Sequence, residues 1–292
     1  WIQGLDVLAI TDHIEYRPFK EYVGGDLNTS YELALPAARE YGIMLIRGTE
    51  VTRKQGVIGH FNALFIEDAN DIEQPDPEKA LQAAYDQGAF IMYNHPAWAL
   101  DTCLLTKFQE DMIAKGIVTG IEVFNNDEFY PRALSWSRDQ KLTVFASSDV
   151  HGTISDDFGV HGSAAARTPF RPMTLVFVKE KTQEGVREAL DGRRTLAYFY
   201  DNLAGEEQWL KSLFLASVQL EKVSEKGGSA SCKMTNLSGI QYKFTMGNAQ
   251  YTLDAGSSIH ITLPANQREV SLHILNMHCY EGMHPVVSMV LE

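Results

Sequence analysis

The stretch LDVLAITDH, residues 5–13, joins a mostly apolar run to a polar tripeptide that ends in His13. Such a run is typical of a strand buried on both faces, and the polar residues then follow its carboxyl end. Similar runs recur at Ile43–Arg47, His60–Ile66, Phe90–Tyr93, Ile121–Phe124, Leu142–Ala146 and Thr174–Val178. Helical stretches separate most of them, for example one that begins at Asp76-Pro77 and ends at Gly88. This alternation predicts an α/β fold with a parallel barrel, and an open doubly wound sheet is the alternative.

The pattern changes after about residue 205. A helical stretch at 206–215 is followed by short strand-like runs at 217–223, 230–236, 241–246, 257–263, 269–276 and 285–291. Short strands joined by frequent turns predict a small antiparallel β-sandwich. We therefore expect an α/β domain over residues 1–205 and a sandwich domain with a connecting helix over 206–292.

Composition narrows the classes of function. The 292 residues carry a net charge of −13, and since 206–292 holds six basic and eight acidic residues, most of that charge lies in the first domain. A chain with this negative charge repels nucleic acid phosphates rather than binding them, and we expect no nucleic acid partner. No apolar run reaches the roughly 18 residues of a membrane span. Three scattered cysteines suit a reducing cytoplasm, but a β-sandwich tail is common outside it, and we favour an extracytoplasmic location.

Histidines and acids stand at the ends of several predicted strands: His13, Glu50, His60, His95, Asp149 and His151. The carboxyl ends of parallel strands meet at one face of such a fold, where catalytic sites lie. A single histidine at a strand end is more often a hydrogen-bonded structural residue. Several strand ends that each carry an imidazole or a carboxylate instead predict a multinuclear Zn, Mn or Fe site.

The motifs LAITDH, RGTEVT, GHFNAL, NHP and SSDVHG, in this order, resemble those of the PHP (polymerase and histidinol phosphatase) superfamily. The resemblance covers roughly residues 1–200 and includes the continuation that ends in TLAYF. It implies a distorted (β/α)7 barrel and a metal-dependent phosphoesterase that uses two or three divalent cations. By the same resemblance, a water activated by these cations attacks the phosphorus of a small phosphorylated substrate.

The resemblance also distributes the six residues over three metals. Glu50 bridges the first two metals and Asp149 is a ligand of the first, so these two carboxylates are the catalytic residues. His60 and His95 complete the second metal site. His13 and His151 bind the third metal. Arginines 17, 53 and 171 lie near the motif loops and are candidates for gripping phosphate, although a surface or ion-paired role is simpler for each.

One departure concerns the family's first motif, a His-x-His on the first strand, which does not occur in these residues. The chain begins at Trp1, and Gly4 has the character of a helix end, so we expect an upstream segment with that motif and one more strand. A fragment that truly began at Trp1 would hold metal weakly and have poor activity. The alternative function is a non-catalytic PHP-like scaffold whose sandwich recognises a glycan or a protein. The retained ligands favour the enzyme.

Overall fold

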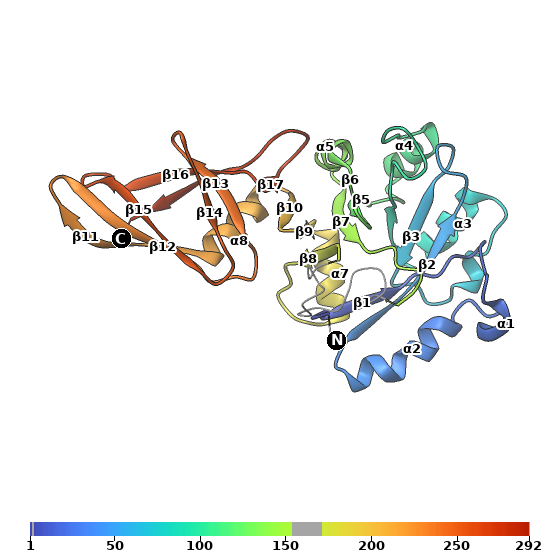
Figure 1. Cartoon of the computed structure of the whole chain (residues 1–292). Coiled ribbons are helices and arrows are strands. Elements are labelled where there is room, and N and C mark those ends of the chain that lie inside the picture. Colours follow the sequence, from blue (N-terminus) through green and yellow to red (C-terminus); the bar gives the residue numbers. More distant parts are fainter. Residues whose placement is uncertain (2, 154–170, 292) are drawn as a thin grey trace.

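The structure is a computed structural model that describes residues 1, 3–153 and 171–291 (Figure 1). A curled half-barrel sheet with its helices lies at one end of the molecule, and two antiparallel sheets lie at the other. Among the described residues, no helix has the length and apolar character needed to cross a membrane.

The curled sheet has the order β1-β2-β3-β4-β5-β6, with β7 also paired to β5. Its strands are β1 (Val7–Ile10), β2 (Met44–Thr52), β3 (His60–Leu64), β4 (Phe90–Tyr93), β5 (Gly120–Asn125), β6 (Glu128–Phe129) and β7 (Thr143–Ser147). The β1–β2, β4–β5 and β5–β7 pairs are parallel, but β3 is antiparallel to both of its neighbours. The expectation of a wholly parallel sheet is wrong here, because the loop 53–59 is too short for the crossover that a parallel β2–β3 pair needs. The described residues form a curled half-barrel rather than a closed (β/α)7 barrel.

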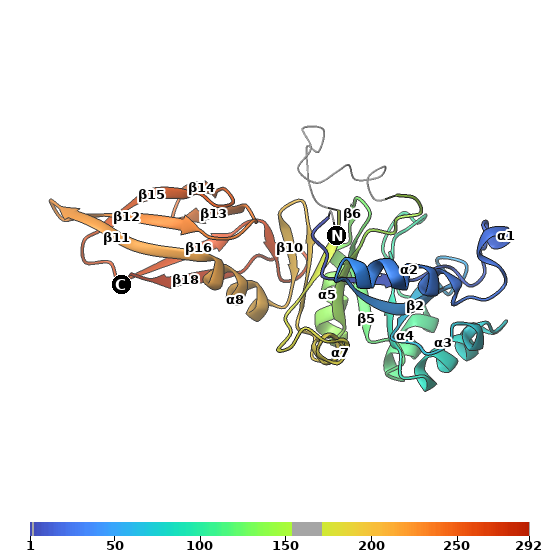
Figure 2. The ribbon, with the colours of Figure 1, turned by 90° about the horizontal axis from the view of Figure 1, so that it is seen from below.

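Helices flank this sheet, and one of them begins at the cap predicted at Asp76. They are α1 (Lys20–Val23), α2 (Thr29–Glu40), the 3-10 helix η1 (Asn70–Ile72), α3 (Pro77–Asp86), α4 (Lys107–Ala114), α5 (Pro131–Gln140) and α7 (Gln183–Asp191). Asp76 caps α3 by accepting hydrogen bonds from the backbone N–H groups of Glu78 and Lys79, and Pro77 occupies the first turn. Helices α3 and α4 lie next to each other at the end of the molecule away from the tail (Figure 2). The apolar faces of α3, α4 and α5 enclose, with one face of the sheet, a core that includes Leu81, Ile91 and Leu134. Helix α7 packs in a separate cluster, in which Val186 and Leu190 lie with Phe90 and Met92 of β4.

A second sheet joins the two ends of the molecule. It contains β8 (Met173–Val176), β9 (Thr195–Phe199), β10 (Asn202–Gly205) and β17 (Met277–His278) in the order β17-β10-β9-β8. The hydroxyl of Thr195 donates to the carbonyl of Val144 in β7 at 2.8 Å, which ties this sheet to the curled one. Helix α8 (Glu207–Ser217) follows β10 and leads into the tail.

The tail forms the predicted antiparallel sandwich. One sheet contains β11 (Val218–Lys226), β12 (Ser229–Asn236) and β15 (Ser258–Pro264); the other contains β14 (Ala249–Leu253), β13 (Tyr242–Met246), β16 (Glu269–Ile274) and β18 (Val286–Val290). Alternate residues of β12 and β16 are buried, as expected for strands with one face toward a core. Residues of both sheets, among them Met234 and Phe244, share a core that continues into β9, β10 and α8. Strand β14 was not predicted, because its residues are largely exposed and polar.

Candidate metal centre

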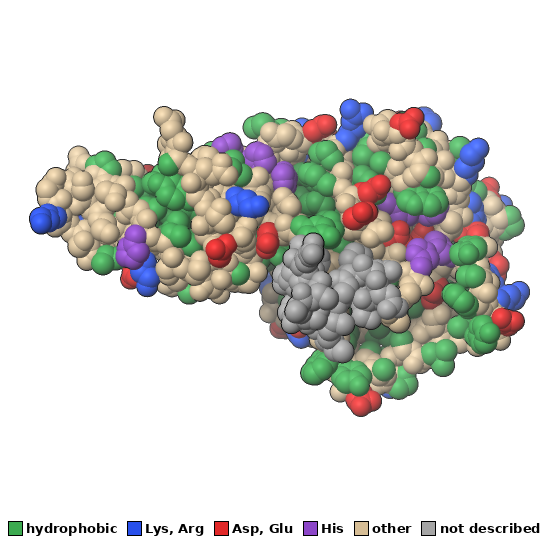
Figure 3. All heavy atoms as spheres, in the orientation of Figure 1, with side chains coloured by type: hydrophobic (Ala, Val, Ile, Leu, Met, Phe, Trp, Pro, Cys, Tyr) green, Lys and Arg blue, Asp and Glu red, His purple; other side chains and the backbone are tan. Residues whose placement is uncertain are grey.

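The backbone brings four strand ends together at one face of the curled sheet. After β1 the chain continues to pair with β2: the N–H of Ile14 donates to the carbonyl of Glu50, and the N–H of Glu50 donates to that of Asp12, each at 2.9 Å. This pairing places His13 beside Glu50. Strand β3 runs opposite to β2, so its first residue, His60, lies level with Thr52 near the end of β2. Figure 3 shows histidine side chains beside acidic ones on this part of the surface.

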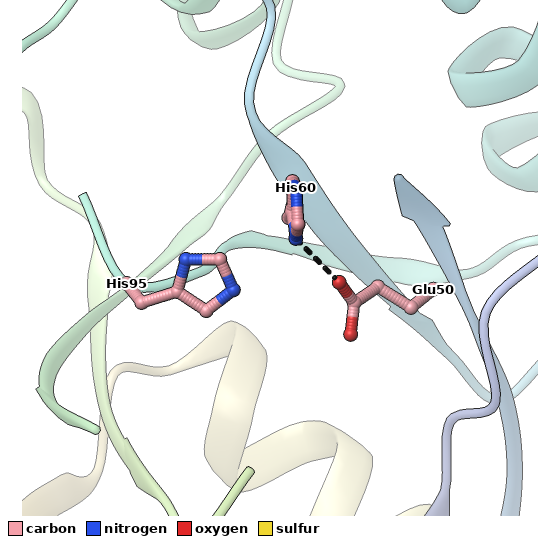
Figure 4. A group of neighbouring side chains, drawn as sticks. All are labelled: Glu50, His60 and His95. Atoms are coloured by element: carbon pink, nitrogen blue, oxygen red, sulfur yellow. Dashed lines mark ion pairs between the residues drawn. The ribbon is translucent and has the colours of Figure 1, made fainter. Parts of the chain in front are cut away.

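Glu50, His60 and His95 form a compact buried group (Figure 4). They come from β2, from β3 and from the turn after β4, and one ligand atom of each lies within 4.8 Å of the others. Nδ1 of His60 is 2.9 Å from Oε1 of Glu50, and the two imidazole rings lie 4.7 Å apart between centroids. All three side chains belong to residues that are less than 9% exposed. The structure therefore assembles the three residues that the resemblance assigns to one metal.

The donor atoms of this group fit a divalent cation. Nδ1 of His60 and Nδ1 of His95 are buried and have no hydrogen-bond partner among the described residues. The short contact between His60 and Glu50 lacks the angles of a hydrogen bond. In Figure 4 the ring nitrogen of His95 that faces Glu50 is Nε2, while its Nδ1 points away. A carboxylate oxygen and one nitrogen from each of two imidazoles, all within 4.8 Å of one another, are a donor set that Zn, Mn and Fe accept.

The protonation states of the group also suit metal binding. Burial acts to raise the pKa of Glu50, but the contacts and charges of His13 and His60 outweigh it and hold the pKa at about 2. Burial, together with the charge of His60, lowers the pKa of His95. Near neutral pH the carboxyl of Glu50 is therefore ionised and the ring of His95 is neutral, which are the forms that coordinate metals.

A second pair of histidines borders this group. Nε2 of His13 lies 3.2 Å from Nε2 of His151, and their rings stack at 5.5 Å. Nδ1 of His13 is 2.5 Å from the hydroxyl oxygen of Thr52 and 3.4 Å from Oε1 of Glu50. The contact with the carboxylate of Glu50 raises the pKa of His13 against the opposing effect of burial. The structure thus brings together the two histidines that the resemblance assigns to a third metal, at the edge of the buried group.

Asp149 lies beside these residues but outside the three-residue group. One of its carboxylate oxygens is 3.9 Å from Nδ1 of His151, and its charge acts to raise the pKa of both His13 and His95. Its backbone has a φ of 52°, in the left-handed region. A non-glycine residue held there is strained, and such strain is frequent at functional sites.

Sequence reasoning missed Glu122, which lies beneath the site. This fully buried residue of β5 accepts hydrogen bonds at Oε2 from the backbone N–H of His95 at 2.7 Å and from the side-chain amide of Asn125 at 2.8 Å. The first bond anchors His95 where its backbone takes a φ of 26°. Burial raises the pKa of Glu122 to about 8. A single acid inside the apolar run GIEVF was the signal that could have identified it.

Two of the three arginines near the motifs are held in ion pairs, and the third is buried. Arg17 forms an ion pair with Glu73 at 2.5 Å, and Arg53 forms one with Glu15. Arg171 is 2% exposed and donates from Nη1 to the side-chain oxygen of Gln3. The simpler ion-paired interpretation of Arg17 and Arg53 is therefore confirmed.

Fold and site together define a two-part α/β protein with a buried carboxylate and imidazole centre of the kind found in metallohydrolases. A crystal structure from Bacteroides vulgatus, described as a two-domain protein containing a predicted PHP-like metal-dependent phosphoesterase, is 34% identical to this chain. The match has a TM-score of 0.90 and covers 99% of this chain and 87% of that chain. The chain belongs to this PHP-like family of two-domain proteins, as its motifs predict.

Two more distant structures resemble parts of the chain. A candidate metal-dependent phosphoesterase from Bifidobacterium adolescentis is 16% identical, with a TM-score of 0.40 over 64% of this chain and 86% of its own. An amidohydrolase from Chromobacterium violaceum, solved with sulfate and no metal, is 15% identical, with a TM-score of 0.36 over 53% of this chain and 80% of its own. No family model matches the chain, and no curated protein matches it.

Proposed function

We propose that the protein is a metal-dependent phosphoesterase that hydrolyses a small phosphorylated substrate at the Glu50, His60 and His95 group. The observation that carries the proposal is this buried group, in which a carboxylate and two imidazoles bring one ligand atom each within 4.8 Å of one another. The relative that is 34% identical is itself described as containing a predicted metal-dependent phosphoesterase, which supports the same activity here.

We propose further that the centre is di- or trinuclear. Glu50 and Asp149 would be its catalytic carboxylates, with Asp149 serving one cation and His13 with His151 serving another, and Zn, Mn and Fe all suit these donors. When bound, divalent cations supply Lewis acidity that lowers the pKa of a water and offsets negative charge on the phosphoryl oxygens. The support for more than one cation is the close approach of His13 to both Glu50 and His151.

The chain's own residues prepare this site in three ways. Glu50 stays ionised across the physiological pH range, because its pKa is about 2. Glu122 fixes the backbone of His95 by accepting its N–H, so the imidazole is held in place before any ligand arrives. His151 lies at the edge of the group with a side chain that is 61% exposed, so its imidazole is accessible to a ligand.

Metal loading and hydrolysis measured together test the proposal. Metal-free protein is supplied with Zn, Mn or Fe, and its metal content and its hydrolysis of an aryl phosphate are recorded. We expect both to be lost in Glu50→Gln and in His60→Ala, since each change removes a donor, and both to persist in Glu184→Gln, an exposed position in the first turn of α7. Full metal content without hydrolysis of any phosphoester would instead favour the scaffold alternative.

A further inference from the structure

A large aromatic side chain is left partly in water beside the metal-ligand group. Trp98 lies in the segment between β4 and α4, with its ring centroid 5.4 Å from that of His60 and 5.6 Å from that of His95. Despite these contacts it is 49% exposed. Figure 3 shows hydrophobic side chains next to the histidines on this face of the molecule. An exposed tryptophan face beside a polar site is a surface that a ligand can cover with a gain in free energy.

Backbone hydrogen bonds hold Trp98 in this position. Its N–H donates to the carbonyl of His95 at 2.9 Å, and the side-chain amide of Gln55 donates to the same carbonyl at 3.1 Å. Farther along the segment, the N–H of Leu104 donates to the carbonyl of Pro96. These bonds fix the backbone at Trp98, and its ring packs against the rings of His60 and His95, which limits the conformational entropy lost when a ligand stacks on it.

Two loops near Trp98 are bonded to each other and carry exposed apolar side chains. The hydroxyl of Thr106 donates to the carbonyl of Val57 at 2.9 Å, which joins the loop 53–59 to the segment that carries Trp98. Val57 is 51% exposed and Leu104 is 40% exposed. We call Val57, Trp98 and Leu104 the apolar rim. Tyr16, which is 60% exposed and 5.9 Å from the ring of His13, adds a second aromatic surface at the other histidine pair.

We propose that Trp98 is the residue that selects the organic part of the substrate, and that the preferred substrates are phosphoesters carrying a flat aromatic ring. This inference rests on the proposed function, because it takes the phosphoryl group to lie at the buried ligand group. A ring attached to that phosphoryl group stacks on Trp98 and contacts the rest of the apolar rim. Arg17 and Arg53 are already paired with carboxylates, so recognition on this side depends on the apolar rim rather than on their charge.

Two phosphoesters whose leaving groups are both primary alcohols test the role of Trp98, because their intrinsic reactivity toward hydrolysis is similar. We compare kcat/KM for 2-(naphthyl)ethyl phosphate with kcat/KM for butyl phosphate. Stacking on an aromatic ring contributes up to about 1.4 kcal/mol, which corresponds to a tenfold change, so Trp98→Ala should lower the ratio of the two values about tenfold. Trp98→Phe, which keeps a ring, should retain most of the preference. Tyr85→Ala is the matched control, because Tyr85 is 47% exposed but lies in α3, just before the opposite end of β4.

A binding measurement separates failure of this inference from failure of the proposed function. Naphthylmethylphosphonate, which is not hydrolysed, is titrated by calorimetry into cation-loaded wild type and Trp98→Ala, with methylphosphonate as the reference. We expect the substitution to weaken the first ligand about tenfold relative to the second. An unchanged relative affinity, or an unchanged kcat/KM ratio, would overturn the role of Trp98. If wild type hydrolysed neither ester, the proposed function would fail and the titration would still decide the inference.

Discussion

Replacing Glu122 by glutamine should change how the stability of the metal-free protein depends on pH. Burial raises the pKa of this carboxyl from 4.5 to about 8, so the folded state keeps a proton that the unfolded chain releases. Stability from this group is therefore present below pH 4.5 and is lost as pH rises toward 8, at about 1.4 kcal/mol per pH unit. Between pH 5.5 and pH 7.5, ionisation of Glu122 alone should lower the free energy of unfolding of wild type by about 3 kcal/mol.

Glutamine has the shape of the protonated acid and cannot ionise. Its amide oxygen can accept the N–H groups of His95 and Asn125, so Glu122→Gln should fold and should lack this loss. Urea unfolding with a chelator present, at pH 5.5 and at pH 7.5, measures the difference in free energy of unfolding between variant and wild type. Between pH 5.5 and pH 7.5, the free energy of unfolding of the variant relative to wild type should rise by about 3 kcal/mol. Glu184→Gln replaces an exposed residue, so its free energy of unfolding should depend on pH in the same way as that of wild type. If the stability of Glu122→Gln also had the pH dependence of wild type, the carboxyl of Glu122 would not be the buried acid described above.

Three further predictions follow from local geometry. Gly59→Ala should cost more than about 2 kcal/mol in urea unfolding, because the new Cβ would lie 2.6 Å from the buried ring of Tyr93 at a φ of 91°, whereas Gly239→Ala meets nothing within 4 Å and should be tolerated. Asn28-Thr29-Ser30 and Asn236-Leu237-Ser238 match the N-glycosylation sequon, but both asparagines should stay unmodified in a secreting host, since both are buried with bonded side-chain amides. A glycan detected by mass spectrometry at either would contradict this. Affinity for divalent cations should fall below about pH 6 as protons compete for the imidazoles, and equal affinities by calorimetry at pH 5 and pH 8 would argue against histidine ligands.

The sequence predicted the parts of the fold that depend on short-range patterns. The apolar run at Phe90–Tyr93 has the bounds of β4, and the cap at Asp76 begins α3 as expected. Strand direction was not predictable in the same way. An apolar run such as the one that forms β3 has the same pattern in a parallel and in an antiparallel pair, and only the length of the connection distinguishes them. The domain boundary near residue 205 and the location outside the cytoplasm stay predictions.

The candidate site was predicted through its motifs rather than through spacing alone. Glu50, His60 and His95 are far apart in the sequence, and the structure confirms that they meet. Glu122 and Trp98 were missed because neither is a metal ligand in the motif pattern. Their roles come from burial beneath His95 in one case and from exposure beside it in the other, and these properties exist only once the chain has folded.

Anomalous X-ray diffraction from crystals of metal-loaded protein tests the central claim most directly. The account predicts an anomalous peak bound by the carboxylate of Glu50 and by one imidazole nitrogen each of His60 and His95, at about 2.0–2.2 Å. Loaded crystals that showed no peak among these three side chains, or a metal bound only elsewhere on the chain, would contradict it.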